Sequence, residues 1–160
     1  MNRLVVGIGN PLRRDDGIGP AVVTSLAGAA PPHTRLLVSD GEPLTLLDAW
    51  RDADLAIVVD AARTALAPAG SIHRTVLVAG EFTLLDGRAR GSHDFALADT
   101  VRLAAALERC PARLIGYAVE LADEGFGPGL SPQVARAVPE VCRRIVAELT
   151  DSAVRSAARG

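Results

Sequence analysis

The chain has 160 residues, of which 49% are hydrophobic, and this is enough for one domain with a substantial core. Its formal net charge of −2 argues against a nucleic-acid-binding surface, and no apolar run is long enough to cross a bilayer. The two cysteines, Cys110 and Cys142, are widely spaced and predict buried thiols rather than a disulfide scaffold or a metal site. The chain enters a predicted strand without the basic and apolar regions of a signal peptide, so we expect a cytoplasmic protein.

The first half of the chain alternates predicted strands with predicted helices. Strands are predicted over residues 3–8, 35–39 and 55–60, and helices over residues 16–28 and 43–51. The third strand is apolar until Asp60, which is typical of a central parallel strand covered on both faces. This order of elements predicts a doubly wound α/β sheet.

The second half breaks this alternation. About ten residues separate the third strand from the next candidate strand, 71–78, which is too short for a helical crossover, so we expect that strand to be antiparallel. A helix over 94–108, a strand over 113–119 and a last helix starting at Ser131-Pro132 follow. The prediction is a single-domain α/β/α sandwich over residues 1–150, around a mostly parallel five-stranded sheet with one antiparallel strand. Residues 151–160 are expected to be a frayed tail, and the absence of a leftover apolar stripe predicts a monomer.

A glycine-rich loop with two adjacent carboxylates follows the first strand. It reads Gly7-Ile8-Gly9-Asn10-Pro11-Leu12-Arg13-Arg14-Asp15-Asp16-Gly17-Ile18-Gly19. The third glycine of a dinucleotide-binding fingerprint is missing, because Leu12 stands three residues after Gly9. Asp15 and Asp16 would repel a phosphate and attract a cation, so a nucleotide-binding domain is disfavoured.

Three polar residues fall beyond the carboxyl ends of predicted strands, where ligands bind in open α/β sheets. Asp16 follows the first strand, Asp60 ends the third, and His93 stands just before a predicted helix. Two carboxylates and an imidazole suit a borderline divalent cation such as nickel or zinc, with positions left open for water or substrate. Each residue also has an ordinary explanation: Asp15 or Asp16 can complement a helix dipole, Asp60 can cap a turn, and His93 can be a surface histidine.

A second acidic set, Asp40, Glu42 and Glu120, also lies at strand ends. These carboxylates could orient the ligands or bind a substrate chain. The other two histidines are not predicted ligands. His33 follows two prolines in a loop and is expected to be solvated, and His73 is expected to point outward from the fourth strand.

The opening motif resembles that of the hydrogenase maturation endopeptidases, which trim the C-terminal extension from the large subunit of nickel–iron hydrogenases. The resemblance extends over nearly the whole chain. Later segments match in the expected order: Asp40-Gly41, Val58-Val59-Asp60-Ala61, Ser92-His93 with Leu97-Ala98-Asp99, and Gly129-Leu130-Ser131-Pro132. The opening motif is fairly specific, and the other segments support it.

The resemblance implies an endopeptidase without a serine or cysteine nucleophile, whose metal ligands and catalytic residues are Asp16, Asp60 and His93. Family members carry Glu or Asp at the first of these positions. The register of the motif favours Asp16 over Asp15, although the sequence alone leaves Asp15 open. The residues expected to bind substrate or to support the ligands are Asn10, Asp15, Asp40, Gly41 and Glu120.

The implied function is nickel-dependent removal of the C-terminal extension from a hydrogenase large-subunit precursor. The nickel would be carried by that precursor, and zinc or cadmium could take its place in a crystal. The precursor is the expected partner, with no nucleic-acid or membrane partner. The alternative is a non-catalytic maturation chaperone that binds the nickel-loaded precursor, and detection of a cleaved C-terminal peptide separates the two.

Overall fold

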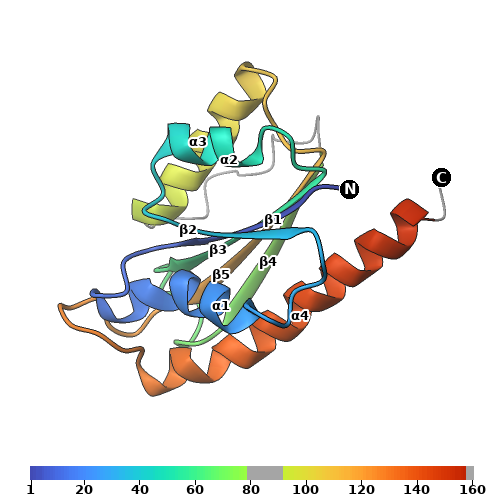
Figure 1. Cartoon of the computed structure of the whole chain (residues 1–160). Coiled ribbons are helices and arrows are strands. Elements are labelled where there is room, and N and C mark those ends of the chain that lie inside the picture. The colour runs from blue at the N-terminus through green and yellow to red at the C-terminus, as the bar shows by residue number, and fades with distance from the viewer. Residues whose placement is uncertain (79–91, 158–160) are drawn as a thin grey trace.

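The computed structural model describes residues 1–78 and 92–157 (Figure 1). Within them one sheet is built from β1 (Arg3–Ile8), β2 (Thr34–Ser39), β3 (Leu55–Ala62), β4 (Ile72–Val78) and β5 (Arg113–Glu120). The strand order is β2-β1-β3-β5-β4. The first four strands in this order are parallel, and β4 pairs with β5 in the antiparallel direction. The predicted mostly parallel sheet with one antiparallel strand is confirmed.

Helices cover both faces of this sheet (Figure 1). α1 (Ile18–Leu26) and α4 (Pro132–Ala157) lie on one face, and α2 (Pro43–Trp50) and α3 (Ser92–Ala106) lie on the other. Successive residues of β1 and β3 point to opposite faces, so each strand contributes to two cores. The α1–α4 core includes Val5, Ile57, Ile115, Val141 and Ile145, and the α2–α3 core includes Leu4, Leu47, Trp50, Val58 and Leu114. The predicted α/β/α sandwich is therefore correct.

Two element ends near the site differ from the sequence predictions. β3 continues beyond Asp60 to Ala62, because Ala61 and Ala62 keep pairing with the last residues of β5. α1 begins at Ile18 rather than Asp16, because a 3-10 turn, η1 (Arg14–Gly17), precedes it. Asp16 thus lies in a tight turn that leads into the helix, and Asp60 lies inside a strand.

The last helix also runs further than predicted. Residues 151–157, expected to be a frayed tail, continue α4 to Ala157. The buried Ser152 hydroxyl donates to the Leu149 carbonyl at 2.8 Å, and the Arg3 Nη1 group on β1 donates to the same carbonyl at 3.0 Å. Arg3 and Leu149 are 146 positions apart in the sequence, so a local pattern could not predict their contact. Among residues 1–78 and 92–157, no helix combines the length and the apolar character needed to cross a membrane.

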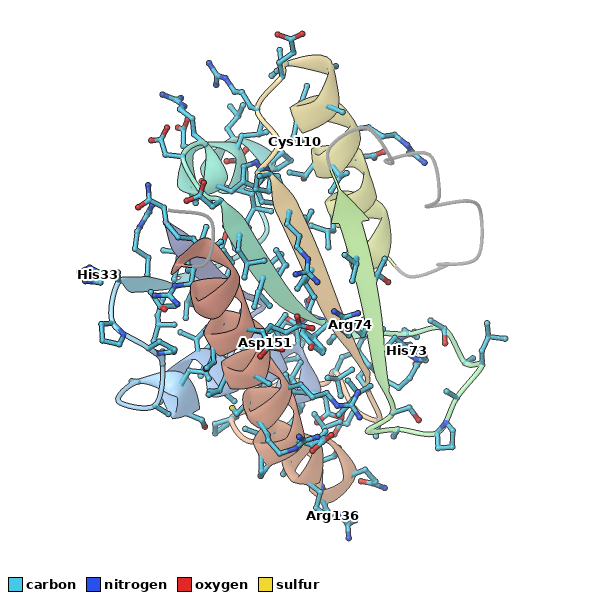
Figure 2. The ribbon with its side chains drawn as sticks, turned by 90° about the vertical axis from the view of Figure 1, so that its right-hand side faces the viewer. His33, His73, Arg74, Cys110, Arg136 and Asp151 are labelled. Carbon is cyan, nitrogen blue, oxygen red and sulfur yellow. The ribbon has the colours of Figure 1, made fainter. Side chains whose placement is uncertain are left out.

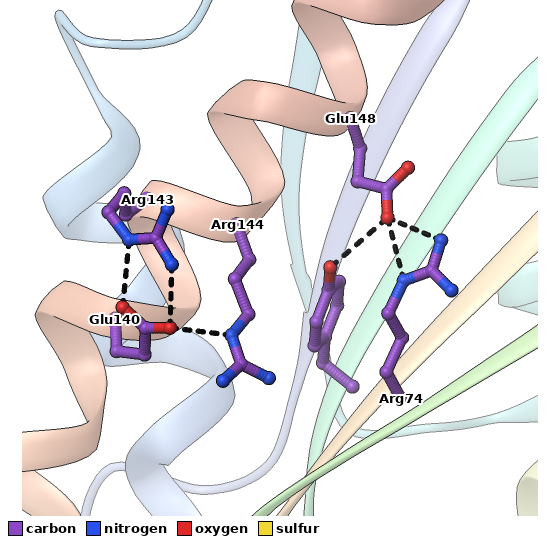
Figure 3. A network of polar contacts seen from close by, with 6 residues as sticks. Arg74, Glu140, Arg143, Arg144 and Glu148 are labelled. Atoms are coloured by element: carbon purple, nitrogen blue, oxygen red, sulfur yellow. Dashed lines mark hydrogen bonds and ion pairs between the residues drawn. The ribbon is translucent and has the colours of Figure 1, made fainter.

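Polar contacts join α4 to the edge strand β4 and to its neighbour β5 (Figure 3). The Arg74 Nε group on β4 donates to Glu148 Oε1 on α4 at 2.7 Å, and the Tyr117 hydroxyl on β5 donates to the same oxygen at 3.4 Å. Burial raises the pKa of Tyr117, and the negative charge of Glu148 raises it further. Tyr117 therefore stays neutral and keeps its hydroxyl proton for this contact.

Candidate active site

Three glycines let the start of α1 pack directly on the end of β1. A Cβ at Gly7 would lie 2.2 Å from the Gly19 carbonyl oxygen, and a Cβ at Gly19 would lie 2.4 Å from the Ile8 carbonyl oxygen. Gly9 has a φ of +139°, and a Cβ there would lie 1.8 Å from the Asp16 carbonyl oxygen. The glycine pattern therefore serves close backbone contact, which brings η1 against the sheet.

Asp16 and Asp60 lie at the same edge of the sheet. Asp16 follows the end of β1, and Asp60 lies near the end of the neighbouring strand β3. β1 pairs with β3 so that Gly7 stands beside Val59, and η1, which carries Asp16, contacts β3. Both carboxylates are buried, with 6% of Asp16 and 5% of Asp60 exposed. The Asn10 N–H donates to Asp16 Oδ2 at 2.8 Å, and the Ala61 N–H donates to Asp60 Oδ1 at 2.8 Å.

His93, the third predicted ligand, is the second residue of α3. Its side chain lies outside the described part of the structure. Figure 1 shows that α3 begins at the edge of the sheet where β1 ends, which is also the edge that carries Asp16 and Asp60. Among the described side chains, no group of three His, Cys, Asp or Glu residues is placed to hold a metal ion. The role of His93 stays a prediction.

Asp15, by contrast, anchors a second loop, which joins β5 to α4. Its side chain is fully buried, and its carboxylate accepts hydrogen bonds from the Ala122 and Asp123 N–H groups, both at 2.8 Å. The Ser131 N–H and hydroxyl also donate to it, at 2.7 and 2.9 Å. Burial acts to raise the pKa of Asp15, but these hydrogen bonds outweigh it and lower the pKa below its ordinary value of 3.8. The adjacent carboxylates therefore have different environments.

The turn between β2 and α2 carries Asp40, Gly41 and Glu42. Gly41 has a φ of +90° and donates its N–H to the Ser39 hydroxyl at 3.1 Å. Glu42 caps α2 by accepting from two N–H groups of the first turn, and these hydrogen bonds lower its pKa. Asp40 is exposed, and its carboxylate accepts from the Glu42 N–H at 3.0 Å. Asp40 thus presents an exposed carboxylate at the carboxyl edge of the sheet.

Glu120 has partners other than the candidate ligands. It is 2% exposed, and its carboxylate accepts from the Thr64 N–H and hydroxyl and contacts His73 Nε2 at 3.1 Å. The sequence pattern correctly predicted that His73 lies on a strand. It did not predict the contact with Glu120, because that contact depends on the antiparallel pairing of β4 with β5. In Figure 2, His73 and His33 lie on opposite sides of the molecule, so they do not converge on one site.

Comparison with known proteins identifies the family. The hydrogenase maturation protease family matches residues 20–148, which is most of the chain. The chain is also 31% identical, over 149 residues, to the hydrogenase expression/formation protein HupD of Rhodobacter capsulatus, covering 89% of this chain and 70% of that protein. The chain belongs to the hydrogenase maturation protease family, and it is accordingly a peptide-bond hydrolase.

Solved structures agree with this assignment. The hydrogenase maturating endopeptidase HybD from Escherichia coli is 25% identical, with a TM-score of 0.77 and coverage of 95% of this chain and 94% of that chain. The hydrogenase maturation protease HybD from Thermococcus kodakarensis shares the fold at 20% identity, with a TM-score of 0.73 and coverage of 91% and 97%. The resemblance inferred from the sequence motifs is therefore confirmed.

Proposed function

We propose that the protein is a nickel-dependent endopeptidase that removes the C-terminal extension of a nickel–iron hydrogenase large-subunit precursor. The observation that carries this proposal is the pair of buried carboxylates, Asp16 and Asp60, at one edge of the sheet in a member of a protease family. Both carboxylates lie where the parallel strands β1 and β3 end, which is where ligands bind in open α/β sheets. The family supports the reaction, and the carboxylate pair supports the metal dependence.

The residues present fit a borderline divalent cation. Carboxylate oxygens and an imidazole nitrogen form a mixed oxygen and nitrogen donor set that binds nickel or zinc. We propose Asp16, Asp60 and His93 as the ligands, with the Asn10 N–H holding one oxygen of Asp16 in place. Three protein ligands leave the remaining coordination positions to the precursor.

In this proposal the nickel arrives as part of the substrate. Held by Asp16, Asp60 and His93, the nickel would supply Lewis-acid chemistry that activates the scissile carbonyl or a water molecule for hydrolysis. The ligand set of this chain positions the scissile bond by binding the precursor's ion, and a neighbouring carboxylate is the candidate general base. A precursor without nickel lacks the anchor, so cleavage acts as a checkpoint for metal loading. We further propose that the protein acts in the cytoplasm as a monomer.

Substitution of the proposed ligands tests this function. Asp60→Asn and His93→Ala should each reduce cleavage of the nickel-loaded precursor by at least about 100-fold, because loss of a metal ligand or catalytic group has an effect of that size. Cleavage would be followed by mass spectrometry of the large subunit, and folding by circular dichroism. Asp48→Asn, on the exposed surface of α2, is the matched control and should cleave normally. Wild-type rates in either ligand variant would contradict the site assignment.

A further inference from the structure

An exposed platform lies beside the candidate site, where two distant loops join. We define it by Leu12, Arg13 and Phe126. Leu12 is 64% exposed and Phe126 is 85% exposed, and the Arg13 guanidinium lies 5.4 Å from the centre of the Phe126 ring. A cation at this distance from an aromatic ring is attracted to it. The platform therefore combines apolar area with a positive charge.

The two loops are held together by backbone contacts. The Gly127 N–H donates to the Leu12 carbonyl at 2.8 Å, and the Arg14 N–H donates to the Gly127 carbonyl at 3.0 Å. The Arg14 guanidinium donates to the Pro128 carbonyl at 3.0 Å, and beneath the loops the Asp15 carboxylate binds the start and end of the second loop. The platform is thus preorganised, which reduces the entropic cost of binding a partner.

The platform is also joined directly to the candidate site. The Asn10 N–H binds Asp16, while the Asn10 side-chain oxygen accepts from the Leu12 N–H at 2.9 Å. Asp16 stands four positions after Leu12, and four steps of extended chain span at most about 14 Å. A peptide held at Asp16 therefore reaches the platform within a few residues of its bound position.

The carboxylates in the loop that carries Phe126 have partners other than Arg13. Glu124, in the same loop as Phe126, forms an ion pair with Arg63, and Asp123 accepts from the Gly125 N–H. Among residues 1–78 and 92–157, no carboxylate forms an ion pair with Arg13. A peptide with an apolar side chain next to a carboxylate would complement this surface.

We propose that this platform binds an extended segment of the precursor, within a few residues of the scissile bond, that presents an apolar side chain and a carboxylate. The inference rests on the proposed function for the identity of the partner. Leu12 and Phe126 supply apolar contact, and Arg13 supplies charge complementarity and therefore part of the association rate. These three residues are binding residues and take no part in the chemical step.

Equilibrium binding and processing kinetics test this proposal separately. The nickel-loaded precursor would be titrated against the full-length protein by biolayer interferometry, and cleavage would be followed by mass spectrometry. Phe126→Ala and Arg13→Glu should each weaken binding by about tenfold, as truncation of an interface anchor does. KM should rise by a similar factor while kcat stays within about twofold, because uniform binding is lost. Binding should weaken with added salt in the wild type and less so in Arg13→Glu.

Matched controls lie at the opposite edge of the sheet, between α3 and β5. Leu107→Ala and Arg109→Glu alter an exposed apolar residue and an exposed arginine there, and both should bind and cleave as the wild type does. Wild-type binding in Phe126→Ala and Arg13→Glu would overturn the docking proposal and leave the protease function standing. A wild type that binds but does not cleave would overturn the protease function, and the Kd values would still decide the docking. A wild type that does neither would overturn both.

Discussion

At the scale of single residues, the adjacent carboxylates Asp15 and Asp16 illustrate what the sequence can and cannot resolve. The motif register favoured Asp16 as the ligand but left Asp15 open. The structure gives Asp15 four hydrogen bonds from residues more than 100 positions away, whereas Asp16 lies in η1, which contacts β3, the strand that carries Asp60. No local sequence pattern indicates the partners of Asp15, because they depend on how the loop between β5 and α4 packs against the loop after β1.

Asp15→Asn should destabilise the fold. The amide replaces an acceptor oxygen with a donor group facing other donors, and a buried polar group without its partners costs about 2–4 kcal/mol. Urea denaturation would measure the loss in the free energy of unfolding. Asp48→Asn on the exposed face of α2 is the control for the chemical change and should leave this free energy within about 0.5 kcal/mol. A stability equal to that of the wild type would show that Asp15 does not anchor the second loop.

The same residue predicts a pH dependence. The pKa of Asp15 is lowered in the folded protein, so the unfolded chain takes up the proton first as the pH falls. The stabilisation by Asp15 is therefore complete above its ordinary pKa of 3.8 and is lost as the pH falls through the lowered value. The difference in unfolding free energy between wild type and Asp15→Asn should be flat from about pH 5 to 8 and should shrink below about pH 4. A difference that stays constant in acid would contradict the lowered pKa.

At the scale of elements, periodicity and turn residues predicted the type and order of the described strands and helices, because each element buries its own apolar residues in the expected pattern. The ends were predicted less well. α4 continues past Thr150 because Ser152 and Arg3 contact Leu149, and β3 continues past Asp60 because β5 extends beside it. Such ends are set by tertiary contacts, which a local pattern does not contain.

The packing of α1 on β1 gives a prediction at this scale. Gly19→Ala should destabilise the protein by about 3 kcal/mol or more, because the added carbon would meet backbone atoms that cannot move aside. Gly116→Ala on β5 is the control, since a Cβ there would meet no atom within 4 Å. Thermal unfolding of the two variants would compare them. Equal melting temperatures would mean that α1 does not approach β1 this closely.

At the scale of the whole molecule, the parallel sheet explains why residues far apart in the sequence share one edge. Strands β1, β2, β3 and β5 all end there, so the last residues of these strands and the loops after them bring Asp16, Asp40, Asp60 and Glu120 to one side. The sequence predicted this edge from the α/β order alone. It did not predict the joining of the loop around Arg13 to the loop around Gly127, because that contact forms only when the whole sheet is assembled.

We propose above that the protein cleaves only a precursor that already carries nickel. The most direct measurement is mass spectrometry of the hydrogenase large subunit after incubation with this protein, with nickel-loaded and nickel-free precursor compared side by side. We expect loss of a C-terminal peptide from the loaded form alone. Equal cleavage of both forms would contradict the metal checkpoint, and complex formation without cleavage of either would favour the maturation chaperone.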